Sequence, residues 1–416
     1  MASASSRSAP ITQPYHKHVT ISFWSWVPGI DKAVAAFEKA YPTIHVKLLN
    51  VGAGLTGEYP KLITALEAHK GAPDVVQIEY YELPTIVRTG GILNLSKLGA
   101  NRYQKDFFPW AWHQVAFQGG IYSIPQDQGP LALLYNASLF KRYHLTVPKT
   151  WAEFSADAAK FHNAAPSLYF NIDINPANSA LLTALAWAAN GQLAFYSNGQ
   201  WQFPVTSPAW KKTLSLWQNM AYKGWVSDNV PGFSIQSNSL FAHDKVATEI
   251  AAAWSPALLE GVAPKSSGQW RVAPLPSWNP KVPVSGDWGG SSDAVTVQSK
   301  HPHASLLLAT WLNTNQTAMS LDWLNGGLYP ADIAGTRLAA ISSPWRYFGG
   351  QRIGSVFSEA ATHINQNFLW PPVVNYFDLQ WSDLLTKAVQ AHGSWTATLP
   401  QIQMDLQQYA RTSGVN

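Results

Sequence analysis

The sequence predicts an α/β protein with more than one domain. The chain has 416 residues, of which 46% are hydrophobic, so it can form two or three separate cores. Strand and helix patterns alternate between residues 19 and 78, in the order strand, helix, strand, helix, strand. This order is typical of a largely parallel sheet with helices packed on its faces.

The elements of this first region follow from local patterns. VTISFW (19–24) alternates and ends in aromatic residues, as a first strand should. The helix predicted over 29–41 has Ile30, Val34 and Phe37 at helical spacing, and Pro42 ends it. The remaining predicted elements here are a strand at 44–51, a helix at 58–69 and a strand at 74–78.

Further elements are predicted along the rest of the chain. LALLY (131–135) is an apolar strand, and Thr150 with Glu153 forms a capping-box pattern that begins a helix over 150–162. Asn198-Gly199 predicts a hairpin within 195–203. The other predicted helices are 179–190, 208–222, 303–312, 355–367, 381–389 and 399–409, and the other predicted strands are 270–275 and 292–297.

Composition excludes several classes of function. Only 12% of residues are charged, against roughly 25% in an average soluble protein. The net charge is +4 with no dense Lys/Arg run, so nucleic acid is not an expected partner. There is no cysteine for disulfides, thiolate nucleophiles or metal sites, and no run of about 18 apolar residues that could span a membrane. Because few carboxylates change charge as the pH falls, we expect the protein to work in acid.

The N-terminal stretch, residues 1–18, is small and polar. It lacks the apolar segment of a signal peptide, so we expect a flexible tether and no signal segment in this chain.

The glycines of GAGLTG (52–57) match the G-x-G-x-x-G pattern, with Glu79 about 20 residues further on. However, they follow the second predicted strand instead of the first, and Glu58 would place a carboxylate near a bound pyrophosphate. We therefore favour a flexible strand-to-helix loop at the rim of a cleft. His301 and His303 do not share a helical face and have no supporting ligands, so neither a metal nor a cofactor is expected.

The most informative feature of the composition is its high tryptophan content, with 20 residues of this type. Those on apolar helix faces, such as Trp187 and Trp217, are expected in the core. Five others lie beside turns, namely Trp24, Trp26, Trp254, Trp288 and Trp381. The flat face of an indole can pack on the C–H face of a sugar ring while neighbouring Asp, Glu, Asn and Gln side chains bind the hydroxyls. The pattern therefore favours a carbohydrate site.

Many segments, in this order and spacing, resemble the family-1 extracellular solute-binding proteins of ABC importers, the class that contains maltose-binding protein. They begin with VTISFW, FEKAYP, IHVKLL, GAPDVVQIE, TGGILNLSKL, GGIYSIPQDQGPLALLYNASLF and VPKTWAEF. They continue with VATEIAAAWSPAL, VAPLPSW, GGSSDAVTV, HASLLLATWLNT, GGLYPA and YFGGQ. The resemblance covers nearly the whole chain after Val19.

The resemblance implies a periplasmic-binding-protein-like fold of type II. Each of two lobes would be a mainly parallel sheet flanked by helices, and hinge bending would close the lobes on a ligand. Lobe I would comprise residues 19–127 and 274–325, and lobe II residues 128–273 and 326–416. The hinge crossings would lie near 127–131, 271–275 and 322–328.

The resemblance also implies a set of ligand-binding residues. In the first lobe these are Trp24 at the end of the first strand and Glu79 with Tyr80 after the third. Asp127 and Gln128 would line the cleft beside the hinge, with Asp127 buried only when ligand hydroxyls satisfy it. The remaining candidates are Trp254, Asp287, Trp288, Gly290, Tyr329, Phe348 and Trp381.

The implied function is that of a non-enzymatic sugar-binding subunit, expected to be a monomer, that delivers its ligand to membrane permeases from the extracellular face of a bacterial membrane. The cysteine that carries a lipid in this family is missing, so the sequence does not indicate whether the protein is a surface lipoprotein or a periplasmic protein. Two alternatives remain open. Glu79 and Asp287 could be the acid and base of a carbohydrate-active enzyme, or the ligand could be another solute such as a polyamine, a peptide or iron.

Overall fold

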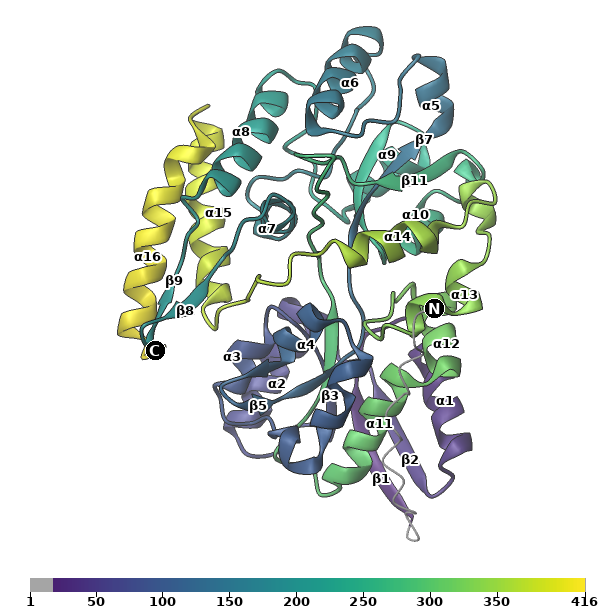
Figure 1. Ribbon diagram of the computed structural model, residues 1–416, viewed down its shortest axis with the longest axis vertical. Helices are drawn as coiled ribbons and strands as arrows, with labels where there is room; N and C mark the ends of the chain where they lie inside the picture. Colours follow the sequence, from purple (N-terminus) through teal and green to yellow (C-terminus); the bar gives the residue numbers. More distant parts are fainter. Residues whose placement is uncertain (1–17, 416) are drawn as a thin grey trace. The chain divides into compact units, whose positions relative to one another are not determined.

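The computed structural model describes residues 18–415, so the predicted tether lies almost entirely outside the described residues. The chain divides into two compact units. Unit 1 contains residues 18–128 and Gly289–Ile341, and unit 2 contains Gly129–Trp288 and residues 342–415. Strands and helices are distributed through both units (Figure 1), which confirms the α/β class.

Unit 1 is built on a five-stranded sheet in the order β2-β1-β3-β12-β6. The strands are β1 (Val19–Trp24), β2 (Ile44–Leu49), β3 (Val75–Glu79), β6 (Ser123–Pro125) and β12 (Ser291–Val295). β1 is parallel to β2 and to β3, as predicted, whereas β12 is antiparallel to β3 and to β6.

Helices cover both faces of the unit 1 sheet. Because β2 and β3 lie on opposite sides of β1, right-handed crossovers place the two connecting helices, α1 (Ile30–Ala40) and α2 (Glu58–Glu67), on opposite faces (Figure 1). The other helices are α3 (Leu83–Val87), α4 (Pro109–Val115), α11 (Pro302–Thr314), α12 (Gln316–Gly326) and α13 (Ala339–Ser342). The remaining strands of unit 1, β4 (Ala116–Phe117) and β5 (Gly120–Ile121), form a small separate hairpin. Short 3-10 turns are η1 (Gly54–Thr56), η2 (Leu95–Leu98), η3 (Ala100–Asp106) and η5 (Gly335–Arg337).

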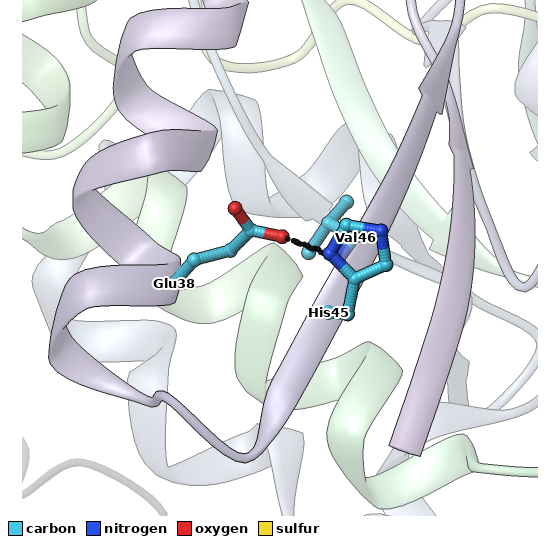
Figure 2. A network of polar contacts seen from close by, with 3 residues as sticks. All are labelled: Glu38, His45 and Val46. Carbon is cyan, nitrogen blue, oxygen red and sulfur yellow. Dashed lines mark hydrogen bonds and ion pairs between the residues drawn. The ribbon is translucent and has the colours of Figure 1, made fainter. Parts of the chain in front are cut away.

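A polar contact ties α1 to β2. The Oε1 atom of Glu38 accepts a hydrogen bond of 2.8 Å from the backbone N–H of Val46 and lies 2.8 Å from Nδ1 of His45 (Figure 2). The His45 side chain is 70% exposed, so the pair with His45 adds little, and the bond to the backbone is the part that fixes the helix against the strand.

Unit 2 contains a three-stranded sheet with β7 (Leu131–Asn136) between β10 (Thr248–Ala252) and β11 (Trp270–Pro274). Both neighbours are antiparallel to β7, so the prediction of a mainly parallel sheet is wrong for this unit. The apolar run of β7 indicates a strand covered on both faces, and such a run does not specify the direction of its neighbours.

Helices make up most of the rest of unit 2. They are α5 (Ala137–Arg142), α6 (Trp151–Ala164), α7 (Ser179–Ala188), α8 (Pro208–Tyr222), α9 (Ile235–Ala242), α10 (Ser255–Val262), α14 (Ile353–Thr362), α15 (Val374–Gln390) and α16 (Leu399–Thr412). The 3-10 turns are η4 (Pro264–Ser266), η6 (Arg346–Phe348) and η7 (Trp395–Thr398). Trp187 on α7 and Trp217 on α8 are buried, which confirms the prediction that they belong to the core.

Two local predictions in unit 2 are confirmed by hydrogen bonds and backbone geometry. The Thr150 hydroxyl accepts from the N–H of Glu153 at 3.2 Å, and the Glu153 carboxylate accepts from the N–H of Thr150 at 3.0 Å, which completes a capping box on α6. The predicted hairpin pairs β8 (Phe195–Ser197) with β9 (Gln200–Gln202), and its turn residues Asn198 and Gly199 both have positive φ.

The chain passes between the units at 128/129, 288/289 and 341/342, which places the second and third crossings later than the sequence predicts. Residues after β11 stay with unit 2, because Leu131 donates its N–H to the carbonyl of Gly286 at 3.2 Å. Tyr329 stays with unit 1, because its carbonyl accepts the N–H of Gln128 at 2.9 Å. Both bonds join residues far apart in the chain, so local patterns do not reveal them.

Candidate functional site

Unit 1 has a candidate site at the carboxyl ends of β1 and β3. In open α/β sheets, ligands bind where neighbouring connections leave in opposite directions, and β1 and β3 flank such a position. Trp24 is the last residue of β1 and Glu79 is the last residue of β3. The loop after β1 is held by Gln77, whose Oε1 accepts from the Ser25 hydroxyl at 2.7 Å and from the N–H of Trp26 at 3.3 Å.

Glu79 is enclosed by two tyrosines. Its Oε2 atom accepts hydrogen bonds from the hydroxyls of Tyr81 at 2.9 Å and Tyr59 at 3.1 Å. Burial raises the pKa of Glu79, and the two phenol hydrogen bonds oppose this by stabilising the carboxylate. The ring of Trp26 packs edge-on against Tyr59, with centroids 5.9 Å apart. Carboxylate and aromatic groups therefore share this end of the sheet.

The segment that follows β6 contributes Gln126, Asp127 and Gln128, all of which are buried. The Oδ1 atom of Asp127 accepts the N–H of Ser291 at 2.7 Å, so the expectation that only ligand hydroxyls satisfy Asp127 is wrong. Burial raises the pKa of Asp127 to about 7. Gln128 donates from Nε2 to the carbonyl of Pro330 at 2.8 Å, and its Oε1 has no hydrogen-bond partner among residues 18–415.

Gln126 is a candidate that the predicted set omits. Neither its Oε1 nor its Nε2 has a hydrogen-bond partner in the described part of the chain, although both atoms are buried. Buried polar groups in native proteins are normally satisfied, so an unpaired amide of this kind is suited to a ligand or to water. The signal was present in the sequence, because Gln126 belongs to the same polar triplet as Asp127 and Gln128.

Tyr80 and Gly290 are both buried, so they shape the site from the interior of unit 1. Tyr80 is fully buried, packs edge-on against Trp110 and donates its hydroxyl to the backbone carbonyl of Asp127 at 3.0 Å. Gly290 has a φ of +81°, and a Cβ there would lie 2.7 Å from the Tyr80 ring. These two residues position Asp127 and the start of β12, which is a different role from the predicted contact with ligand.

Several carboxyl groups are buried together beneath this end of the unit 1 sheet. Burial, with Asp293 and Glu79 nearby, raises the pKa of Glu58 to about 9, and neither carboxylate oxygen of Glu58 has a partner in the described chain. Burial also raises the pKa of Asp293 to about 7, and that of Asp322 well above its usual range. Burial therefore opposes the charged form of these acids, and ionisation of one raises the pKa of the next.

The glycine loop 52–57 connects β2 to α2, as expected for a strand-to-helix loop. A Cβ at Gly57 would lie 2.5 Å from the backbone nitrogen of Ala53, so the loop folds closely on itself. A Cβ at Gly54 would lie 3.4 Å from Oε2 of Glu79, which places the loop beside the end of β3. The buried carboxyl of Glu58 at the start of α2 is unfavourable for a phosphate.

Unit 2 has a candidate site of its own, an aromatic cluster of Trp254, Trp288 and Phe233. Trp254 lies at the start of α10, and its indole N–H donates to the backbone carbonyl of Trp288 at 2.8 Å. The two indole rings meet edge to face with centroids 5.0 Å apart. Phe233 lies 5.8 Å from Trp254 and 6.1 Å from Trp288, and it is 63% exposed. Phe233 was not predicted, although it lies beside Gly232 in a turn, which was the criterion used for the tryptophans.

Asp287 holds the loop that carries Trp288. Its Oδ1 accepts the N–H of Gly129 at 2.6 Å, and the N–H of Trp288 donates to the carbonyl of Gly129 at 2.9 Å. A Cβ at Gly129 would lie 2.0 Å from the carbonyl oxygen of Trp288, so only glycine fits here. Asp287 therefore fixes the position of an aromatic side chain in unit 2.

Three predicted site residues lie inside their units, and packing accounts for them. Trp381 is fully buried beside Trp210 and Phe377, and its N–H donates to the carbonyl of Pro176 at 2.8 Å. Phe348 is fully buried and packs edge-on against Tyr347 and Trp345, and Tyr329 packs edge-on against Trp323. None of the three side chains presents a free face in this structure.

The fold and the site lead to a family assignment. Residues 24–319 match the model of the family described as "Bacterial extracellular solute-binding protein". This chain belongs to that family. Its members bind solutes and are not enzymes, in agreement with the prediction from the sequence.

Other members of this solute-binding family resemble the chain over most of its length. The arabinooligosaccharide-binding protein of Halalkalibacterium halodurans is 19% identical over 371 residues, which are 85% of this chain and 82% of the relative. A solved structure from B. animalis subsp. lactis, an ABC transporter associated binding protein in complex with beta-1,6-galactobiose, has a TM-score of 0.82 at 26% identity and covers 96% of this chain and 99% of its own. The galacto-N-biose-/lacto-N-biose I-binding protein from Bifidobacterium longum has a TM-score of 0.83 at 24% identity, with 95% and 98% covered.

These similarities confirm the type II periplasmic-binding-protein-like fold for this member of the solute-binding family. The family description places such proteins outside the cell. Within residues 18–415, no helix has both the length and the apolar character required to cross a bilayer.

Proposed function

We propose that this chain is the substrate-binding subunit of an ABC transporter, which captures a mono- or oligosaccharide outside the cell and delivers it to a membrane permease. The observation that carries this proposal is the pair of Trp254 and Trp288, fixed edge to face by a hydrogen bond and flanked by the exposed ring of Phe233. Rigid aromatic faces of this kind suit the apolar C–H face of a sugar ring.

Unit 1 also carries polar groups that suit sugar hydroxyls. The carboxylate of Glu79 and the unpaired amide of Gln126 accept and donate the hydrogen bonds that sugar hydroxyls need. Relatives named for arabinooligosaccharide, galactobiose and lacto-N-biose binding support a carbohydrate as the ligand class.

In this proposal the ligand shifts the population of the protein towards a closed state, because it binds that state more tightly. The protein acts as a monomer at the extracellular face of a bacterial membrane, either as a surface lipoprotein or in the periplasm. The closed, loaded form is the one that docks on the permease.

The enzyme alternative is weaker because its two candidate carboxylates already have structural partners. Glu79 accepts from two phenol hydroxyls, and Asp287 accepts from the backbone of Gly129. The family of binding proteins to which the chain belongs also argues against catalysis. Release of reducing sugar by the purified protein would favour the enzyme.

A thermal-shift screen against common mono- and disaccharides tests the proposed function. A ligand that binds the folded state raises the melting temperature by mass action, by several degrees at a concentration far above its Kd. A panel of amino acids, polyamines and ferric chelates serves as the control for other solutes. Stabilisation by one of these compounds and by no sugar would refute the proposal.

A further inference from the structure

Unit 2 contains a partly open pocket of about 330 Å³ that adjoins the aromatic cluster. Phe233 and Trp288 belong to both the cavity wall and the cluster. Apolar side chains, including Phe241 and Leu259, form most of the remaining wall. For comparison, an apolar cavity of about 150 Å³ is sufficient to hold benzene. The cavity can therefore accept a ring-sized group that extends from a ligand on the cluster.

Two carboxyl groups, those of Asp173 and Glu249, also line this cavity. The Oδ2 atom of Asp173 accepts from the side-chain amide of Asn171 at 2.6 Å and from the N–H of Ile250 at 2.5 Å. The Oε2 atom of Glu249 is buried and has no hydrogen-bond partner among the described residues. None of the described residues that line the cavity is Lys, Arg or His.

The two acids have no cationic partner among the described residues that line the pocket. Burial raises the pKa of Asp173 to about 7, and burial together with the charge of Asp173 raises the pKa of Glu249 well above its usual range. An unpaired buried carboxylate is costly, and a cation beside it removes most of that cost. The solute must therefore supply the positive charge if both acids are to ionise.

The chemistry of the wall distinguishes between possible ligand groups. A carboxylate or phosphate would oppose the ionisation of Asp173 and Glu249 still further, and a hydroxyl would supply no charge to stabilise their ionised forms. A primary ammonium offers three N–H donors and a positive charge. These suit the buried Oε2 atom of Glu249 and the neighbouring carboxylate of Asp173. The aromatic rings of Phe233, Phe241 and Trp288 also favour a cation beside them.

We propose that this cavity is an ammonium subsite, and that the ligand held on Trp254 and Trp288 carries a basic amino group that enters it and pairs with Glu249 and Asp173. This inference deepens the proposed function and rests on it, because it specifies an amine-bearing sugar as the ligand class. Asp173 and Glu249 act by binding and orienting the amino group.

A pair of small probes tests the cavity directly. Cyclohexylammonium and cyclohexanol have nearly the same size and differ in charge, and their affinities can be measured by calorimetry at pH 7.5. Wild-type protein is expected to bind the ammonium at least about tenfold more tightly than the alcohol, a difference of about 1.4 kcal/mol. Absence of ammonium binding, or equal binding of the two probes, overturns the inference.

Two variants assign the preference to the acids. Glu249→Gln keeps the shape of the side chain and is expected to reduce the ammonium preference to less than about twofold, whereas Glu359→Gln on the exposed side of α14 should leave it unchanged. Asp173→Asn retains an oxygen that accepts the two hydrogen bonds, so it gives the same test if Glu249→Gln fails to fold. Retention of the full preference in either folded variant overturns the inference.

A sugar series separates this inference from the proposed function. Cellobiose, its diamino analogue and its di-N-acetylated analogue differ only in the group at C2. The proposed function fails if no carbohydrate in any panel binds, even where Glu249-dependent ammonium binding is found. The ammonium subsite is refuted if sugars bind but the diamino analogue binds wild type no more tightly than it binds Glu249→Gln.

Discussion

The indole N–H of Trp254 donates a hydrogen bond of 2.8 Å to the backbone carbonyl of Trp288, and the two indole rings lie edge to face. Asp287 holds the same loop from its other side through the N–H of Gly129. The aromatic surface of unit 2 is therefore rigid before any ligand arrives, and rigidity of this kind lowers the entropy lost on binding.

Removal of the Trp254 ring should abolish most of the affinity for sugar. Trp254→Ala deletes one aromatic face and the donor that fixes Trp288, so we expect a loss of at least about 2 kcal/mol in binding free energy, as for other aromatic anchors. Calorimetry with the best sugar from the thermal screen measures this loss. Trp201→Ala, on the β9 hairpin, is the matched control and should bind as wild type does. Equal sugar affinities of the two variants would show that Trp254 does not belong to the binding site.

Gly290 should be intolerant of a side chain. Gly290→Ala adds a Cβ 2.7 Å from the Tyr80 ring at a φ of +81°, and we expect a loss of about 2 to 3 kcal/mol in the free energy of unfolding. Gly350→Ala is the control, because Gly350 has a φ of +79° with no atom within 4 Å of its Cβ position. It should lose only about 1 kcal/mol from backbone strain. Urea unfolding of both variants measures the difference, and equal losses would show that contact with Tyr80 is unimportant.

The protein should be more stable in mild acid than at neutral pH. The pKa of Glu58 rises from 4.5 to about 9 on folding, and the pKa values of Asp127 and Asp293 rise to about 7. Between the unfolded and folded values the folded state binds more protons, so the free energy of unfolding falls as the pH rises through this window and is fully retained below it. Urea unfolding at pH 5 and at pH 8 should show the higher value at pH 5.

Glu58→Gln tests the main source of this pH dependence. The neutral amide needs no proton, so the variant should gain at least about 1 kcal/mol over wild type at pH 8 and little at pH 5. Glu67→Gln, at an exposed position of the same helix, is the control and should leave the profile unchanged. A wild-type profile that rises from pH 5 to pH 8 would contradict the assignment. Loss of the near-UV circular dichroism by pH 4 would contradict the expectation that the protein works in acid.

The capping box on α6 should contribute measurably to stability. Thr150→Ala removes the oxygen that accepts the Glu153 N–H and should cost about 1 kcal/mol in the free energy of unfolding. Thr150→Ser keeps that oxygen and should stay within about 0.5 kcal/mol of wild type. Chemical denaturation of the three proteins checks both values, and a cost for Ser that matches the cost for Ala would exclude the cap as the cause.

Much of the fold could be predicted from the sequence because its signals are local. The capping box of α6, the Asn198-Gly199 turn and the strand–helix alternation of the first region depend on neighbouring residues only. The direction of β10 and β11 and the later crossings at 288/289 and 341/342 depend on hydrogen bonds between distant segments, which no local pattern contains.

The candidate site was predictable in part for the same reason. Trp254, Trp288, Asp127 and Glu79 lie beside turns or strand ends, where the sequence pattern identifies them. Trp381 has the same local appearance, yet it is buried beside Trp210 of α8, and its N–H donates to the carbonyl of Pro176. The pairing of Asp173 with Glu249 was not predicted at all, since it depends on two segments that meet only in the folded unit.

The most direct test of the central claim is saturation-transfer NMR from protein aromatic protons to a bound sugar. We expect strong transfer onto the protons of one C–H face of the sugar ring in wild type, loss of that transfer in Trp254→Ala and its retention in Trp201→Ala. A sugar that binds with an affinity measurable by calorimetry but receives no aromatic transfer would contradict carbohydrate recognition by Trp254 and Trp288.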